Sequence, residues 1–285
     1  METIAQTLRT AAERLQTVTE TPRLDAEILL ARALGISRAQ LLARLKEPGQ
    51  ASDFEAMISR RLSHEPIAYI LGEWEFFGLP FFVEPPVLVP RPETEHLVEA
   101  ALGAIQGLES ARVLDIGTGT GCVAIAIACN AAEVSVMATD IREANLELAR
   151  RNAERHGVTD RVEFRCGDLF GPVGADEKFD VIVSNPPYVA EAEYETLSPV
   201  ILKHEDRVAL VAGPTGLEFV ERIIAGALAH LRPGGVIGIE LGEGQYEEAA
   251  ARMTTFGYEE VSPVRDLAGI DRVITGRVGN VAGTV

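Results

Sequence analysis

Positive charge is scarce in this sequence. Its 26 lysines and arginines stand against 43 aspartates and glutamates, which gives a formal net charge of -17. Binding along a nucleic-acid backbone needs a basic face that neutralises phosphates. The composition therefore argues against broad electrostatic docking on DNA or RNA, although it leaves room for a local basic patch.

Paired cysteines, histidine clusters and long apolar runs are also missing. Cys122, Cys129 and Cys166 are odd in number and form no Cys-x-x-Cys pair, so we expect buried, reduced thiols in a reducing compartment. The five histidines show no metal-ligand spacing, and we predict no metal site. Charged residues interrupt the amino terminus, which argues against a signal peptide, and no stretch is long enough to span a bilayer. We expect a cytoplasmic protein.

The first 72 residues carry apolar side chains at helical spacing, separated by helix start and stop signals. Pro22 can begin a helix, Gly35 can end it, and Ser52 or Asp53 can cap a later one. We predict a small helical bundle over residues 1–72. On composition alone, such a bundle could do no more than cover a surface of a larger domain.

The next stretch is rich in aromatic residues around Gly78 and Pro80. Two short strands joined by a turn would produce this pattern, so we predict a β-hairpin linker over residues 73–90. The hexapeptide Pro90–Glu95 then leads into a helix. Its glutamates suit a helix start because the helix dipole favours negative charge there.

From Arg112 onwards, strands and helices alternate. The apolar runs predict strands at 113–116, 134–138, 162–165, 179–184 and 236–241, with a final pair at 259–264 and 272–275. We also predict a helix from 216 to 231 that Pro233-Gly234-Gly235 ends. This order predicts an α/β fold, a doubly wound seven-stranded sheet with an antiparallel edge, in a domain covering 91–285.

A glycine-rich turn follows the first predicted strand of that sheet. It reads Asp115-Ile-Gly-Thr-Gly-Thr-Gly and opens a helix, which is the context that favours ligand binding. The dinucleotide fingerprint needs two residues between its second and third glycines, and this turn has one. It matches instead the tighter turn by which methyltransferases hold the amino-acid part of S-adenosylmethionine. The candidate cofactor-binding residues are Gly117, Thr118, Gly119, Thr120 and Gly121.

Acidic residues end the next two predicted strands. Asp140, about twenty residues beyond the turn, can accept both ribose hydroxyls of a nucleoside. Asp168 stands where an acceptor for an adenine amino group would be useful, and Leu169 can pack on the purine face. Each aspartate alone could equally be a cap or a turn former. Their succession at strand ends, together with the glycine turn, favours the cofactor site.

The tetrapeptide Asn185-Pro186-Pro187-Tyr188 follows the fourth predicted strand. Two prolines supply no backbone donors and end the strand, which presents a carboxamide, a free carbonyl and an aromatic ring together. The Asn185 oxygen and the Pro186 carbonyl can accept from both hydrogens of a planar NH2 group, and Tyr188 can stack on it. We predict that Asn185, Pro186 and Tyr188 are catalytic, that Asn185 to Tyr188 bind substrate, and that Asn185 also contacts the cofactor. The plainer alternative is a rigid turn.

These motifs together resemble the amino-group S-adenosylmethionine-dependent methyltransferases. More narrowly, the chain resembles the HemK/PrmC family, the glutamine methyltransferases of peptide-chain release factors. The narrower likeness rests on the segments at 66–72, 76–78, 87–95 and 266–277. Two positions depart from the family pattern: His204-Glu205-Asp206 replaces a frequent Glu-Pro, and Leu169 replaces an aromatic residue of some members.

The resemblance implies a release factor as protein substrate, methylated on the glutamine of a Gly-Gly-Gln loop, with S-adenosylmethionine converted to S-adenosylhomocysteine. It also implies a helical amino-terminal domain, which we expect to recognise that substrate. We expect a monomer with no direct nucleic-acid or membrane partner. The alternatives are methylation of DNA adenine, which uses the same tetrapeptide on a flipped base, methylation of another protein glutamine such as that of a ribosomal protein, and a binding module without turnover.

Overall fold

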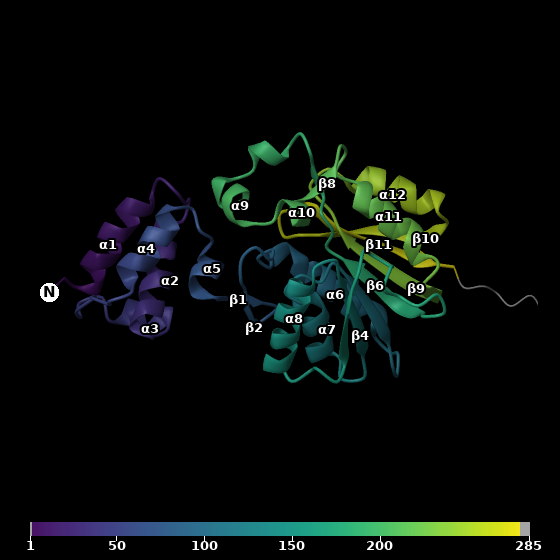
Figure 1. Cartoon of the computed structure of the whole chain (residues 1–285), viewed down its shortest axis with the longest axis horizontal. Helices are drawn as coiled ribbons and strands as arrows, with labels where there is room; N and C mark the ends of the chain where they lie inside the picture. The colour runs from purple at the N-terminus through teal and green to yellow at the C-terminus, as the bar shows by residue number, and fades with distance from the viewer. Residues whose placement is uncertain (1, 280–285) are drawn as a thin grey trace, which may run out of the picture. The chain divides into compact units, whose positions relative to one another are not determined.

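The computed structural model describes residues 2–279 (Figure 1). The chain forms two compact units. The first comprises Met1–Glu73 and Leu197–Glu205, and the second comprises Trp74–Thr196 and Asp206–Val285.

The first unit is helical. It contains α1 (Ile4–Leu15), α2 (Pro22–Leu34), α3 (Arg38–Ala43), α4 (Phe54–Leu62), α5 (Ile67–Leu71) and, from the later segment, α9 (Pro199–His204). The Thr3 side chain caps α1, and Gly35 ends α2 in the left-handed conformation with φ 64°. Leu8, Leu29 and Ile58 lie fully buried between these helices. The apolar stripes that predict helices therefore meet in a core of their own.

Residues 197–205 belong to the helical unit although the sequence places them far from it. The predicted boundary at residue 72 left this segment out. One contact within the unit is the His204 imidazole, whose Nε2 lies 3.3 Å from the Ser63 carbonyl oxygen. The sequence gives no signal that residues 197–205 belong to the helical unit, because a short surface helix carries little hydrophobic periodicity.

The predicted hairpin is present in the structure. Its strands are β1 (Glu73–Phe76) and β2 (Leu79–Phe82), and Phe77 and Gly78 turn between them with φ 52° and 70°. The Asn152 side chain bonds both backbone groups of Phe82, and the Glu95 carboxylate accepts from the Phe77 N–H at 2.8 Å. These bonds hold the turn and the second strand of the hairpin in place within the second unit.

The second unit is built on a seven-stranded sheet of order β10-β11-β9-β6-β3-β4-β5. Its strands are β3 (Arg112–Ile116), β4 (Ser135–Asp140), β5 (Val162–Cys166), β6 (Phe179–Ser184), β9 (Leu231–Glu240), β10 (Tyr258–Arg265) and β11 (Asp271–Val278). Five strands, β9, β6, β3, β4 and β5, pair in parallel, and β11 pairs antiparallel with both β9 and β10. The α/β fold class predicted from the alternation is confirmed.

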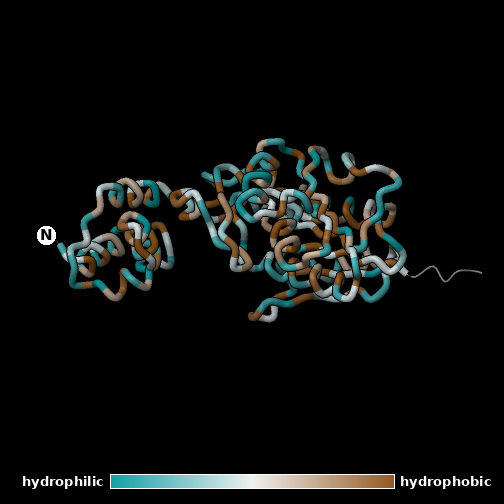
Figure 2. Tube along the Cα trace, turned by 90° about the horizontal axis from the view of Figure 1, so that it is seen from below, coloured by the Kyte–Doolittle hydropathy of each residue, from teal (hydrophilic) through white to brown (hydrophobic). Residues whose placement is uncertain are grey.

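Helices cover both faces of this sheet. Alternate residues of β3 face opposite layers: Val113 joins the core beneath α6 (Glu95–Ile105) and α7 (Cys122–Asn130), and Leu114 joins that beneath α11 (Glu218–Ala227) and α12 (Tyr246–Thr255). Helix α8 (Glu143–Arg155) contributes Ala153 to the first layer. Apolar residues concentrate in the interior of this unit (Figure 2). Its remaining short elements are η1 (Pro92–Thr94), β7 (Val189–Ala190), η2 (Tyr194–Thr196), α10 (Arg207–Leu210) and β8 (Val211–Gly213).

One predicted element boundary is wrong. Pro233-Gly234-Gly235 does not end the preceding helix, because α11 already stops at Ala227 and the three residues lie within β9. There they form a bulge, since the register of β9 shifts opposite Phe179 and Val181, and Gly234 has φ 77°. Proline and glycine mark a backbone irregularity in both cases, and the sequence alone does not say in which element.

Within residues 2–279, no helix is both long and apolar enough to cross a bilayer, and no three His, Cys, Asp or Glu side chains gather as a metal site. The prediction of buried thiols holds for Cys122 and is wrong for Cys129 and Cys166, which are exposed.

Candidate active site

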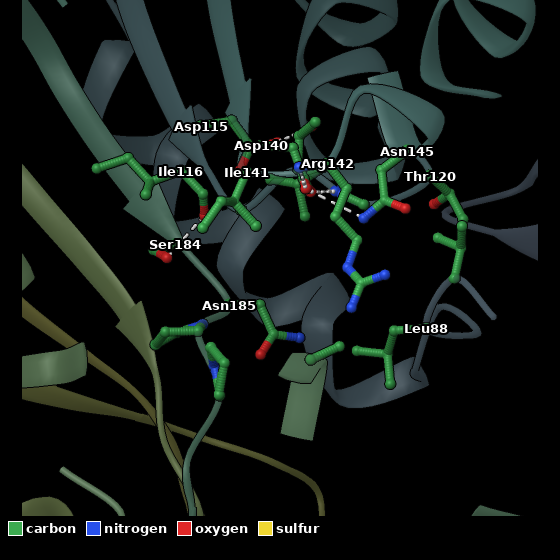
Figure 3. Close-up of a pocket in the computed structure, with 18 of the residues that line it drawn as sticks. Leu88, Asp115, Ile116, Thr120, Asp140, Ile141, Arg142, Asn145, Ser184 and Asn185 are labelled. Atoms are coloured by element: carbon green, nitrogen blue, oxygen red, sulfur yellow. Dashed lines mark hydrogen bonds between the residues drawn. The ribbon is translucent and has the colours of Figure 1, made fainter. Parts of the chain in front are cut away.

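A cavity of about 380 Å³ opens where β3, β4 and β6 end (Figure 3). This is the edge of an open α/β sheet at which ligands bind. Most of the residues predicted from the sequence line it: Gly117, Thr118, Gly119, Thr120, Asp140, Asp168, Leu169, Asn185, Pro186 and Pro187. Gly121 and Tyr188 are not among the lining residues.

The glycine turn needs its glycines for two different reasons. Gly117 and Gly119 have φ 74° and 56° and line the cavity, so no side chain separates the backbone there from a ligand. Gly121 has φ 80° and is the N-cap residue directly before α7, and a Cβ on it would stand 2.9 Å from the Ala149 Cβ of α8. Gly121 therefore serves close helix packing.

Asp115 lies beneath this turn and is buried, with 1% of its surface exposed. The Thr118 hydroxyl donates to Asp115 Oδ2 at 2.6 Å, so this side chain secures the turn from below. Burial raises the pKa of Asp115 to about 7, because it disfavours the charged carboxylate. Near neutral pH, this carboxyl exists in both protonation states.

Asp140 ends β4 and is also buried. Its Oδ2 accepts from the Gly119 N–H at 2.9 Å, and its Oδ1 accepts from the Arg142 N–H and the Asn145 Nδ2, at 2.9 and 3.1 Å. A carboxylate oxygen offers two acceptor positions. Both acceptor positions of Oδ1 are therefore occupied, and one acceptor position of Oδ2 remains. Asp140 can thus accept from one ribose hydroxyl, where the sequence predicted two.

Asp168 and Leu169 follow β5 at the same edge. Asp168 forms an ion pair with Arg222 of α11, and both side chains are about half exposed. The guanidinium of Arg222 also lies 5.5 Å from the ring centre of Phe219, a second α11 residue that lines the cavity. Leu169 has φ 47°, an uncommon conformation for leucine. The sequence suggested Leu169 for the apolar wall of the cavity and missed Phe219 altogether.

Asn185 directly follows β6, and its carboxamide is already engaged on one side. Its Nδ2 donates to the Thr94 hydroxyl at 3.0 Å. This leaves Oδ1 as the atom that can accept from a ligand, as the NH2-binding prediction requires. Pro186 follows as a buried lining residue.

Comparison with known proteins identifies the family. Two family models match, "PrmC N-terminal domain" at residues 6–72 and "Methyltransferase small domain" at residues 94–208. A protein of Nitratidesulfovibrio vulgaris named release factor glutamine methyltransferase is 42% identical over 281 residues, covering 96% of this chain and 95% of that protein. One of the same name from Burkholderia pseudomallei is 42% identical and covers 98% and 99%. This chain belongs to the release factor glutamine methyltransferase family.

The membership confirms the resemblance found in the sequence and establishes the chain as a methyltransferase. The fold agrees with it. A methyltransferase from Pyrococcus furiosus superposes with a TM-score of 0.51 at 22% identity, covering 80% of this chain and 99% of that one.

Tyr188 lies apart from the cavity lining of this methyltransferase. Its backbone carbonyl accepts from the Gln245 Nε2 at 2.9 Å, which fixes the end of the tetrapeptide to the start of α12. Burial raises the pKa of its phenol to about 12, so the ring stays neutral at physiological pH. A neutral ring is what stacking on an amide requires, but no cavity contact places it there.

Several lining residues of this methyltransferase carry no sequence motif. Arg142 forms an ion pair with Asp206 at 2.5 Å, and Figure 3 shows its side chain extending from the Asp140 side toward Asn185. Asp206 is one of the residues by which the chain departs from the family pattern. Arg142 and Asn145 both contact Asp140 within five residues of it, so local spacing after an acidic strand end was the one available signal.

Proposed function

We propose that this chain methylates the side-chain amide nitrogen of the glutamine in the Gly-Gly-Gln loop of class I release factors, with S-adenosylmethionine as donor. The names of the relatives support the substrate. The observation that carries the proposal is the Asn185 carboxamide, whose Nδ2 is bound to Thr94 so that Oδ1 remains for a substrate NH2 group.

The cavity suits the proposed donor. Its volume of about 380 Å³ falls in the range of small-molecule sites. The backbone at Gly117 and Gly119 would contact the amino-acid part of the donor, and Asp140 Oδ2 would accept a hydrogen bond from a ribose hydroxyl. Leu169 and Phe219 would form the apolar wall beside the adenine base. When bound, S-adenosylmethionine supplies an electrophilic methyl group on a sulfonium.

The protein's own part in the reaction is to hold and orient the amide. An amide nitrogen is a poor nucleophile because its lone pair is delocalised into the carbonyl. Acceptors at Asn185 Oδ1 and the Pro186 carbonyl would fix both hydrogens and direct the nitrogen toward the methyl. No strong base is required, since the proton leaves once the nitrogen has become cationic.

The helical unit, over residues 1–72 with 197–205, is part of the same proposal. We assign it to recognition of the release factor away from its glutamine, because the family model for the amino-terminal domain matches residues 6–72. We further propose that the enzyme acts as a monomer in the cytoplasm, without a nucleic-acid partner, in keeping with its net charge of -17.

Mass spectrometry of release factors after incubation with enzyme and S-adenosylmethionine tests the proposal. We expect a gain of one methyl group on the peptide that contains Gly-Gly-Gln, and no gain when that glutamine is replaced by asparagine. Duplex DNA and a ribosomal-protein substrate serve as competing acceptors. Methyl transfer to either of them but not to a release factor would overturn the substrate, and tight release-factor binding without any transfer would overturn the activity.

A further inference from the structure

A buried carboxyl group lies behind Asn185, joined to it through one hydroxyl. Glu240 is the last residue of β9, the strand that pairs with β6, and Thr94 ends η1 directly before α6. The Thr94 hydroxyl hydrogen-bonds the Glu240 carboxyl and accepts from Asn185 Nδ2 at 3.0 Å. Thr94 and Glu240 are each 2% exposed. Three elements thus bring a carboxyl, a hydroxyl and a carboxamide into one chain.

Glu240 is poorly satisfied for a buried acid. Its Oε2 is buried and has no hydrogen-bond partner among residues 2–279. The charged and titratable groups around it are Glu93, Arg91, Arg272, Tyr188 and Cys122. A buried unpaired oxygen of this kind costs stability, and an apolar residue would avoid the cost. An acid kept under these conditions calls for a role that its charge fulfils.

We propose that Glu240 is a positioning residue that fixes the orientation of the Asn185 carboxamide through Thr94. The proposal rests on the proposed function. An ionised carboxylate only accepts hydrogen bonds, so the single hydroxyl proton of Thr94 goes to Glu240. The Thr94 oxygen then accepts, and the carboxamide must turn Nδ2 toward it. Oδ1 is thereby directed to the substrate, where the NH2 group needs an acceptor.

Protonation of Glu240 removes this control over the orientation of the Asn185 carboxamide. A neutral carboxyl can donate to Thr94, which frees the threonine proton to donate to Asn185 Oδ1 and turns Nδ2 toward the substrate. Two NH2 groups would then face each other without an acceptor. Burial raises the pKa of Glu240 to about 7, which places the change in the physiological range. Catalysis should therefore decline as the pH falls through about 7.

The same contacts would exist if Thr94 only joined α6 to β9, so the test needs readouts that a structural role would not move. Thr94→Val removes the hydroxyl at nearly constant shape, Thr94→Ser keeps it, and Glu240→Gln keeps the shape while removing the titration. Asp180→Asn is the matched control, because Asp180 is a partly buried acid whose bonds, to the Arg112 N–H and Arg232, lie at the opposite end of β6.

We expect Thr94→Val to lower kcat about tenfold to a hundredfold with KM for the release factor within about twofold, and Thr94→Ser to restore most of the rate. In the wild type, kcat should rise with pH through about 7. The part of this inflection that Glu240 contributes should be absent in Glu240→Gln, in which Asp115 still titrates, and the whole inflection should be unchanged in Asp180→Asn. Wild-type kcat without the inflection, or a Thr94→Val enzyme with wild-type kcat, would overturn the inference.

A measurement without turnover separates this inference from the proposed function. In ¹⁵N-labelled wild-type protein, the Asn185 side-chain amide resonances, assigned with Asn185→Asp, should shift with a midpoint near pH 7. They should not titrate in Glu240→Gln. If the wild type fails to methylate release factors, the proposed function is wrong, while this titration still tests the positioning role of Glu240. If methylation proceeds and the Asn185 resonances do not change with pH, the positioning role is wrong and the proposed function stands.

Discussion

Two pairs of acids at opposite ends of the central strands differ in their partners. At the start of β6, Asp180 accepts from Arg232 and Glu177 accepts from Arg165, so these acids have cationic partners. Toward the ends of β3 and β9, Asp115 and Glu240 are buried, and in residues 2–279 no ion pair joins either to a lysine or arginine. Their pKa values rise to about 7 through burial, whereas hydrogen bonding to Arg165 lowers that of Glu177 to about 2.

The contrast singles out two acids at the cavity end of the sheet without reference to any motif, although Asp168 at the same edge pairs with Arg222. Paired acids at a strand start lower the free energy of the folded state. Buried unpaired acids raise it, and Asp115 and Glu240 stand toward the strand ends at which the cavity opens. Perturbed titration of this kind clusters at functional sites. The electrostatics therefore point to the same sheet edge as the glycine turn and the tetrapeptide.

Asn185→Ala should produce the largest effect at the functional end. It removes the acceptor that Thr94 and the end of β6 hold in place, so kcat should fall by about ten- to a thousandfold. Folding should be little affected, because the side chain is only partly buried. Single-turnover rates with saturating release factor measure the loss.

Asn185→Asp is the matched variant for that experiment. It keeps an acceptor and the size of the side chain, but it cannot donate to Thr94 and adds a charge. We expect a loss of rate of similar size, with the thermal midpoint of unfolding close to that of the alanine variant. An unchanged kcat in Asn185→Ala would exclude the acceptor role.

Local sequence features were sufficient to predict the fold and the edge of the sheet at which the cavity opens. Strand ends in a parallel sheet meet at one edge, so Asp140, Asp168 and Asn185 could be placed together from their positions after three apolar runs. The positive φ angles of Gly117 and Gly119 likewise follow from a glycine turn between strand and helix. Both inferences depend on contacts close in sequence or on the regular geometry of the sheet.

The remaining features depend on long-range contacts that no local pattern encodes. Thr94 reaches Asn185 across 91 positions, and Arg222 pairs with Asp168 across 54. An acidic residue at the end of a strand is common, so its position in the sequence does not mark Glu240. Only its burial and the missing hydrogen-bond partner of its Oε2 among residues 2–279 distinguish it. Side-chain packing decides these features after the sheet has formed.

Glu240→Gln should stabilise the protein at high pH, which sharpens the comparison between the two ends. An acid whose pKa is raised by folding, here from 4.5 to about 7, resists ionisation in the folded state. The loss of folding stability that this causes is absent below about pH 4.5 and complete above about pH 7. The free energy of unfolding of Glu240→Gln should therefore gain on the wild type between pH 5 and 8, by up to roughly 3 kcal/mol.

Urea unfolding of both proteins across this pH range gives the difference directly. Because Asp115 titrates in both proteins, its contribution cancels when the two curves are subtracted. A difference that stays constant from pH 5 to 8 would contradict a raised pKa at Glu240. A gain in stability together with a loss of kcat would show that the acid is retained for catalysis.

Glu177→Gln should have the smallest effect and the opposite sign. Hydrogen bonds from Arg165 and from the Gly174 N–H lower the pKa of Glu177 from 4.5 to about 2. Its stabilisation is therefore present above about pH 4.5 and is lost as the pH falls through about 2. Since the pair is partly exposed, we expect the variant to lose only about 1 kcal/mol at pH 7. Urea unfolding should show this loss shrinking below pH 4 while kcat stays at its wild-type value, and a loss independent of pH would mean that packing rather than charge holds this end of the sheet.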